Sequence, residues 1–378
     1  MNSKKILILG AGNAQIDAIE YCKAQGYEVT GCSYTNTDHG IPLLDHFRQV
    51  NICDVDGVVQ LARESQVDLI YSIGSDLAMP TVMRASEILG LPHFISAETA
   101  MICHSKHLLR EALGIGFDGN LEFITCSSLE EALAFTAFPG MMKPVDSQGQ
   151  RGCFRVDSPE DIRANFEASL SYSMSKKVIL EAFVDGPEVS VNAYMQDGQL
   201  KFGLVSDRIT FKEYPGGIIK KHILPSHLAD QKTQEAAVDL TLRIARKVGI
   251  CDGPCYCQIK IDHGHPVVLE VTPRLDGCHM WRLIRHYCGA DLLEASFTHL
   301  LENRSVLDGK YDYSRQPCVL EFISEKTGEI IDRSKYDFSG ADYVRWYYDD
   351  GDTVARITGY VEKCGYIIRA GESADWQL

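Results

Sequence analysis

Residues 256–277 read YCQIKIDHGHPVVLEVTPRLDG, and they are the most informative segment of the chain. Two apolar runs flank a turn around Gly264, which predicts a β-hairpin. If the hairpin pairs symmetrically about that glycine, Gln258 faces Glu270 with Cβ atoms about 4.5–5.5 Å apart. Thr272 lies two residues further along and shares that face. Three oxygen-bearing side chains on one face predict a hard-cation site suited to Mg²⁺, which takes its other ligands from water and phosphates.

Three more motifs extend this interpretation. Arg274 follows the hairpin, and its planar fork of donors suits an acyl phosphate. Lys143 precedes a glycine-containing loop at residues 147–152, where backbone N–H groups can fold over phosphates. Glu181 and Glu188 lie seven residues apart around a turn, where carboxylates can accept ribose hydroxyls. Each motif alone has a plainer alternative, a surface turn for the lysine and solvated acids for the glutamates.

Taken together, these motifs resemble the ATP-grasp superfamily, which includes carbamoyl phosphate synthetase, biotin carboxylase, glycinamide ribonucleotide synthetase and D-alanine–D-alanine ligase. The motif from Gln258 to Arg274 is most similar to the Gln…Glu-x-Asn-Pro-Arg form of the carbamoyl phosphate synthetase halves. Thr272 stands where that family usually has Asn, so the second metal position departs from the pattern. The resemblance implies an ADP-forming carboxylate–amine ligase that uses ATP and Mg²⁺, with Mn²⁺ as the alternative ion. Its mechanism would run through an acyl phosphate.

The resemblance also implies roles for individual residues. Arg274 and Lys143 would be catalytic. Gln258, Glu270 and Thr272 would be the metal ligands. The expected ATP contacts are Lys106, Lys143, Gly149, Glu181, Ala182, Phe183, Val184, Glu188 and Lys221. For Lys221, which follows a Pro-Gly-Gly turn, an exposed loop is an equal alternative.

The order of predicted elements divides the chain into three parts. Residues 1–100 alternate short apolar runs with helical stretches, which predicts a Rossmann-like parallel sheet of the α/β class. Residues 101–310 mix helices with antiparallel hairpins, an α+β pattern that would form the ATP-grasp fold. Residues 311–378 are rich in predicted strands and would form a small β-rich lobe completing the grasp domain.

The N-terminal glycine loop offers a different function. Gly10 and Gly12 follow a strand and open a helix, as in dinucleotide-binding folds. However, Gln15 stands where a third small residue belongs, and the second strand ends at Cys32 without the acid that would hold a ribose. We therefore favour tight strand-to-helix packing over NAD binding. A third alternative is that this loop binds substrate together with Asp76.

Two further groups of residues invite a functional interpretation. Arg282 and Arg285 lie three residues apart on a predicted helix, where they could receive an anionic substrate; a solvated face with ion pairs is the alternative. Cysteines and histidines between 251 and 279 could suggest zinc, but their spacing does not form paired C-x-x-C knuckles. Cysteine also fills strand positions as a small apolar residue.

Composition limits the class of protein. The 378 residues carry 37 Lys+Arg against 52 Asp+Glu, a net charge of −15, which disfavours nucleic-acid and anionic-membrane partners. No apolar run approaches the roughly 18 residues of a membrane span, and the N-terminal apolar run is too short for a signal peptide. Thirteen scattered cysteines suit a reducing compartment. We expect a cytoplasmic enzyme that acts on small molecules, with a homodimer as the commonest assembly.

Three rival functions remain open. A carbamoyl-phosphate-type or bicarbonate-activating enzyme would depend on bicarbonate. A nucleotide-binding module without turnover would bind ATP and release no ADP. An NAD-dependent oxidoreductase would bind dinucleotide at the N-terminal loop.

Overall fold

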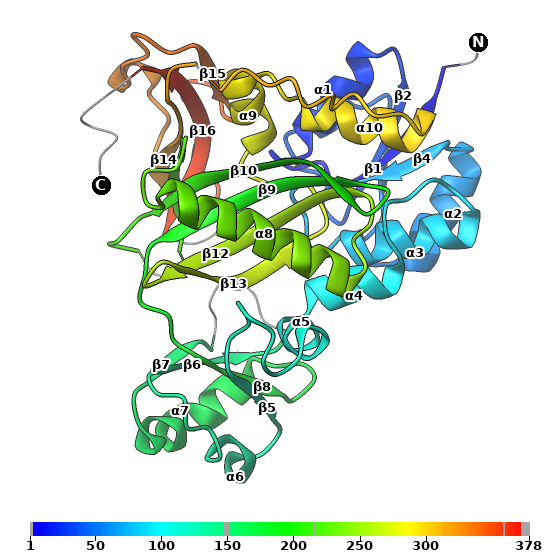
Figure 1. Cartoon of the computed structure of the whole chain (residues 1–378). Helices are drawn as coiled ribbons and strands as arrows, with labels where there is room; N and C mark the ends of the chain where they lie inside the picture. The colour runs from blue at the N-terminus through cyan, green and yellow to red at the C-terminus, as the bar shows by residue number, and fades with distance from the viewer. Residues whose placement is uncertain (1–2, 147–151, 215–216, 314, 358–359, 372–378) are drawn as a thin grey trace.

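The computed structural model describes residues 3–146, 152–214, 217–313, 315–357 and 360–371. It contains a parallel sheet near the N-terminus, a small antiparallel sheet and a large antiparallel sheet (Figure 1). This mixture confirms the predicted fold class. No helix among these described residues is long and apolar enough to cross a membrane.

The first part is a four-stranded parallel sheet in the order β3-β2-β1-β4. Alternate residues of β1 point to opposite faces of this sheet, and each face is covered by helices. Ile6 and Ile8 pack with α1 and α10, whereas Leu7 and Leu9 pack with α2 and α3. The elements are β1 (Lys5–Leu9), α1 (Ile16–Ala24), β2 (Glu28–Ser33), η1 (Ile41–Leu43), β3 (His46–Gln49), α2 (Val55–Ser65), β4 (Leu69–Tyr71) and α3 (Met79–Leu89).

The second part is a small antiparallel sheet in the order β5-β8-β6-β7, which carries α6 and α7 on one face. Both helices begin at serines that accept a backbone N–H, Ser128 in a complete capping box and Ser158 before a proline. The elements are α4 (Ala97–His104), α5 (Lys106–Leu113), β5 (Phe123–Cys126), α6 (Leu129–Ala132), β6 (Gly140–Pro144), β7 (Phe154–Val156), α7 (Pro159–Ser171) and β8 (Val178–Ala182).

The third part is an eight-stranded antiparallel sheet in the order β13-β12-β9-β10-β11-β14-β16-β15. Helix α8 packs on one face, and α9 packs on the opposite face (Figure 1). Three of its strands come from residues 311–378. The elements are β9 (Glu188–Gln196), β10 (Gln199–Thr210), β11 (Ile219–Leu224), α8 (Gln231–Val248), β12 (Gly253–Asp262), β13 (His265–Thr272), α9 (Met280–Cys288), α10 (Leu292–Glu302), β14 (Cys318–Lys326), η2 (Arg333–Lys335), β15 (Tyr343–Trp346) and β16 (Val361–Ala370).

Two faces of this large sheet have different chemistry. Residues such as Val191 and Cys257 pack against α8 in an apolar core. The opposite face is here called the inner face. It carries Gln258, Glu270 and the residues directly opposite them on neighbouring strands, because directly opposed residues point to the same side of a sheet. The inner face therefore holds the polar residues from which a site can be built.

Candidate functional site

The β12–β13 hairpin has the predicted pairing at its functional end. Gln258 pairs with Glu270, and Tyr256 pairs with Thr272. Near the turn the register differs by one residue from the symmetric expectation, because an irregularity after Gln258 leaves Leu269 unpaired as a β-bulge. The Glu270 side chain is 47% exposed. The Thr272 hydroxyl oxygen is buried and has no hydrogen-bond partner among the described residues.

Lys106 and Lys143 approach this hairpin from different elements. Lys106 opens α5, and its Nζ lies 3.8 Å from a carboxylate oxygen of Glu270. Lys143 lies in β6 of the small sheet and donates to Glu181 Oε2 at 2.7 Å. Each ammonium group is thus held by a carboxylate and partly exposed, which suits it to contact an anionic ligand.

A buried ion-pair chain positions Lys143. Glu181 is 1% exposed and accepts both from Lys143 and from Arg110 Nε at 2.6 Å. Arg110 also donates to the Leu269 carbonyl at 3.1 Å, which ties it to the bulge of the hairpin. Burial alone would raise the pKa of Glu181, but Lys143 and Arg110 together lower it to about 2. The Glu181 carboxylate therefore binds protein cations and would act on a nucleotide only through Lys143.

Arg110 is a site residue that sequence analysis missed. It lies one helical turn after Lys106 on α5 and is 1% exposed. The available signal was its spacing, because Leu109, Arg110 and Leu113 share the buried face of this short helix. A buried arginine on such a face needs a carboxylate partner, and Glu181 provides it.

At the end of β8 and just after it, several backbone groups form hydrogen bonds within the protein. The N–H groups of Ala182 and Phe183 donate to Glu122 and Pro139 carbonyls at 2.9 and 2.8 Å. The carbonyl of Val184 accepts from Lys260 Nζ at 3.0 Å. This segment connects the small antiparallel sheet, which contains β8, to the large one, which contains β9.

Glu188 connects the two halves of the predicted site. Its carboxylate forms an ion pair with Arg208 and accepts from Gln258 Nε2 at 2.5 Å. A predicted ribose acid and a predicted metal ligand are therefore direct neighbours. Because the amide nitrogen of Gln258 faces Glu188, its amide oxygen remains available to a cation.

Arg274 and Asp76 come together from distant parts of the chain. Arg274 is 8% exposed, and its Nη2 and Nε lie 2.6 and 2.9 Å from one carboxylate oxygen of Asp76. The two loops that carry them approach closely at glycines. A Cβ on Gly74, where φ is +69°, would lie 2.7 Å from the Cα of Gly277. Only glycines allow this approach, so the N-terminal part is packed against the loop carrying Arg274.

Lys221 does not join these residues. In the β10–β11 pairing, Arg208 faces His222 and Ile209 faces Lys221. Because alternate strand residues point to opposite faces, His222 shares the inner face and Lys221 points to the other side. The ATP contact predicted for Lys221 is therefore not supported by its position.

Arg282 and Arg285 line a separate groove. Its volume is about 590 Å³, and Gln258 and Glu270 are not among its lining residues. Arg282 is bound to the buried carboxylate of Asp17 at 3.1 Å, and Arg285 is bound to Asp291 at 2.9 Å. The structure does not bring them to the hairpin. The predicted ATP contact Gly149 lies outside the described residues.

The N-terminal glycine loop is filled by its own side chain. Gln15 is 7% exposed; its Oε1 accepts from Gly12 N–H at 3.1 Å, and its Nε2 donates to the Ile73 carbonyl. The amide group of Gln15 thus occupies the place in which a phosphate would accept hydrogen bonds from the loop N–H groups. This arrangement favours the packing role over dinucleotide binding.

Comparisons with known proteins agree with this architecture. Residues 136–281 match the model of the ATP-grasp domain family. The chain is 24% identical to the uncharacterized protein y4rH of Sinorhizobium fredii, over 98% of this chain and 77% of that protein. It is also 24% identical to carnosine synthase 1 of Mus musculus, over 78% of this chain but only 39% of that protein.

One solved structure illustrates the likeness of fold. L-amino acid ligase from Bacillus licheniformis superposes with a TM-score of 0.79 at 19% identity. The superposition covers 100% of this chain and 95% of that one. At this level of identity, the match shows a shared fold.

Proposed function

Because the chain contains an ATP-grasp domain and has the corresponding fold, we propose that it is an ATP-dependent carboxylate–amine ligase. A substrate carboxylate attacks the γ-phosphate of ATP, giving an acyl phosphate and ADP. An amine then attacks the acyl carbon, and phosphate leaves as the C–N bond forms. The names of the Bacillus ligase and of carnosine synthase support this class of reaction, although the chain spans well under half of the latter.

One observation carries the proposal. Glu270 projects partly exposed from the inner face beside Gln258, with Lys106 at 3.8 Å, while Lys143 approaches from the small sheet. Lys106 thus lies against the carboxylate–amide pair, and Lys143 is linked to the same hairpin through Glu181, Arg110 and the Leu269 carbonyl. A polyphosphate with a divalent cation would match this arrangement, because the phosphates would bind the lysines and the cation would bind the carboxylate and the amide oxygen.

The oxygen donors of the hairpin fit Mg²⁺ or Mn²⁺. Glu270 supplies a carboxylate, Gln258 an amide oxygen, and Thr272 a buried hydroxyl that lacks a partner among the described residues. These are hard oxygen ligands of the kind that Mg²⁺ uses together with water and phosphates. When bound, the ion would neutralise phosphate charge and make the γ-phosphorus easier to attack.

Two basic side chains would neutralise the remaining negative charge on the phosphates. Lys143, held by Glu181, would stay beside the phosphates without reorganising during the reaction. Arg274, whose guanidinium is fixed by Asp76, would neutralise charge that develops on the transferred phosphoryl group. We retain Arg282 and Arg285 only as proposed contacts for an anionic substrate group within their own groove.

The rival functions make different predictions for the same assay. A bicarbonate-activating enzyme would release ADP only when bicarbonate is present. A binding module would release none, and the departure at Thr272 is the feature that favours it. The filled N-terminal loop argues against the oxidoreductase.

The direct test is ADP release by the purified protein with MgATP, pools of carboxylates and amines, and hydroxylamine. Hydroxylamine converts an acyl phosphate to a hydroxamate, so a ligase would give ADP and hydroxamate together for its carboxylate. Glu270→Gln should abolish both, whereas Glu64→Gln on the exposed face of α2 should change neither. Carboxylate-stimulated ADP release without hydroxamate, or full activity of Glu270→Gln, would refute the proposal.

A further inference from the structure

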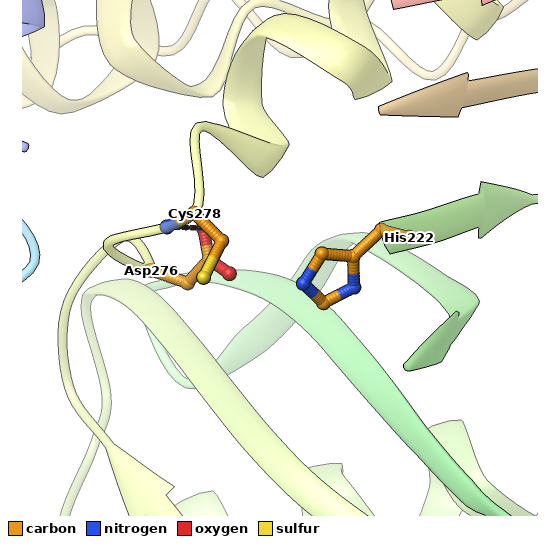
Figure 2. Close-up of side chains that lie close together, drawn as sticks. All are labelled: His222, Asp276 and Cys278. Carbon is orange, nitrogen blue, oxygen red and sulfur yellow. Dashed lines mark hydrogen bonds between the residues drawn. The ribbon is translucent and has the colours of Figure 1, made fainter. Parts of the chain in front are cut away.

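A second group of possible ligands lies on the inner face, apart from the Gln258–Glu270 pair. It consists of His222 on β11 and of Asp276 and Cys278 in the loop between β13 and α9. Figure 2 shows the imidazole ring of His222 pointing toward the other two side chains. One ligand atom from each residue lies within 4.8 Å of the others. Within the part of the chain that the structure describes, it is the one such group of three.

His222 provides the first argument that the group binds something. Its side chain is 0% exposed, and apart from the Asp207 backbone no described group bonds to either ring nitrogen. A buried imidazole with a nitrogen left unsatisfied is costly, so a ligand is expected at that nitrogen. Neutral imidazole is a common metal ligand.

Asp276 and Cys278 are held in position by neighbours. One oxygen of Asp276 accepts from the N–H groups of Cys278 and Met280, both at 3.1 Å, which leaves the other oxygen without a bond to these groups (Figure 2). Lys363 Nζ lies 3.5 Å from the Cys278 sulfur. Such outer contacts orient ligands and stabilise a thiolate in known metal sites.

We propose that His222, Asp276 and Cys278 bind a divalent transition metal ion of the Zn²⁺ type. Nitrogen, oxygen and sulfur donors suit such an ion, whereas Gln258 and Glu270 offer oxygen donors suited to Mg²⁺. A thiolate and a carboxylate would balance the two positive charges. The thiol proton would leave on binding, so that the ion, thiolate and carboxylate together carry no net charge next to Arg208 and Lys363, which lie near the group.

Such an ion would connect the catalytic loop to the sheet. Asp276 and Cys278 follow Arg274 in the same loop, whereas His222 belongs to β11. Coordination would fix this loop on the inner face, next to Arg208, which contacts Glu188 of the nucleotide site. Three protein ligands leave a fourth position for water or a substrate donor.

Cobalt titration tests the site without using enzyme activity. The full-length protein carrying Cys53→Ser and Cys251→Ser, which removes the two exposed thiols, is stripped with a chelator and titrated with Co²⁺. We expect one equivalent to bind with a near-ultraviolet thiolate-to-cobalt band. Adding Cys278→Ser should abolish the band, and His222→Gln should weaken binding by about 100-fold or more. Cys257→Ser, a buried cysteine on the opposite face, is the matched control and should change neither.

Two results would overturn the proposal: no thiolate band at saturating Co²⁺, or an unchanged band in the Cys278→Ser variant. If the variants do not fold, zinc-edge X-ray absorption of the otherwise unaltered protein decides. One sulfur with nitrogen and oxygen neighbours supports the site, and a shell without sulfur contradicts it. Mg²⁺ alone should give no band, so failure here leaves the MgATP site untouched.

Discussion

Arg274 and Asp76 lie 198 residues apart in the sequence, yet both Nε and Nη2 of the arginine contact one carboxylate oxygen of the aspartate. This contact connects the parallel sheet to the loop that follows the β12–β13 hairpin. The same two loops meet at Gly74 and Gly277, where a Cβ on Gly74 would lie 2.7 Å from the Cα of Gly277. The N-terminal part therefore positions a residue that we propose to be catalytic.

The Arg274–Asp76 contact predicts unequal losses of activity. Arg274→Ala should lower kcat by about 10²–10³-fold, because it removes a donor aimed at developing negative charge. Asp76→Asn should lower kcat less and leave the KM for ATP nearly unchanged, because the guanidinium remains but is held less firmly. Steady-state ADP release measures both. Asp118→Asn, an exposed carboxylate, is the control; equal rates for Asp76→Asn and wild type would remove the positioning role.

Glu181→Gln tests the buried ion-pair chain. Removing this charge leaves Arg110 buried with a neutral partner, so the free energy of unfolding should fall by about 3–5 kcal/mol. Urea denaturation followed by circular dichroism measures the change. Glu130→Gln, on the exposed side of α6, should alter the unfolding free energy by less than about 0.5 kcal/mol. A stability loss no larger than that of the control would contradict the proposed chain.

The same carboxylate predicts how stability depends on pH. The pKa of Glu181 is about 2 in the folded protein, below its ordinary value of 4.5. A depressed pKa contributes stability above the unfolded value that disappears as pH falls toward the folded value. This contribution is on the order of 3 kcal/mol. Between pH 5 and pH 2, wild type should therefore lose more stability than Glu181→Gln; parallel losses would show that the carboxylate is not held by these cations.

Thr272 tests the second metal position. If its buried hydroxyl contributes to the cation site, Thr272→Val should raise the Mg²⁺ concentration needed for half-maximal ADP release, because the valine has a similar shape without the oxygen. Thr272→Asn restores the residue usual in the superfamily and should preserve or raise activity. Magnesium titrations of the three proteins provide the measurement. Loss of activity in Thr272→Asn would mean that the threonine has a different role.

The local elements and the β12–β13 hairpin followed from the sequence, whereas the metal site on that hairpin stays a prediction. Symmetry about Gly264 predicted the pairing of Gln258 with Glu270, which the structure has. Beside the turn, however, the strands pair one residue out of that register, and the bulge at Leu269 supplies the shift that brings Gln258 opposite Glu270. Strand-to-helix alternation likewise predicted the parallel sheet, including β1 at Lys5–Leu9.

Contacts between distant elements could not be predicted in the same way. Whether Lys221 or His222 points to the inner face depends on the register of β11 against β10, which no local pattern encodes. The partnership of Arg110 with Glu181 joins α5 to β8, and each residue alone looks like an ordinary charged side chain. Such pairs depend on how distant elements pack together, so local sequence patterns do not predict them.

Calorimetric titration with MgATP, beside NADH and NADPH, is the decisive measurement for the proposed ATP site. We expect saturable binding of MgATP to wild type and to the exposed control Lys232→Ala, with weaker binding to Lys143→Ala. We expect no binding of either dinucleotide. Dinucleotide binding without MgATP binding would refute the proposed function, because it would place the function at the Gly10–Gln15 loop and leave the likeness to ATP-grasp proteins as a shared fold only.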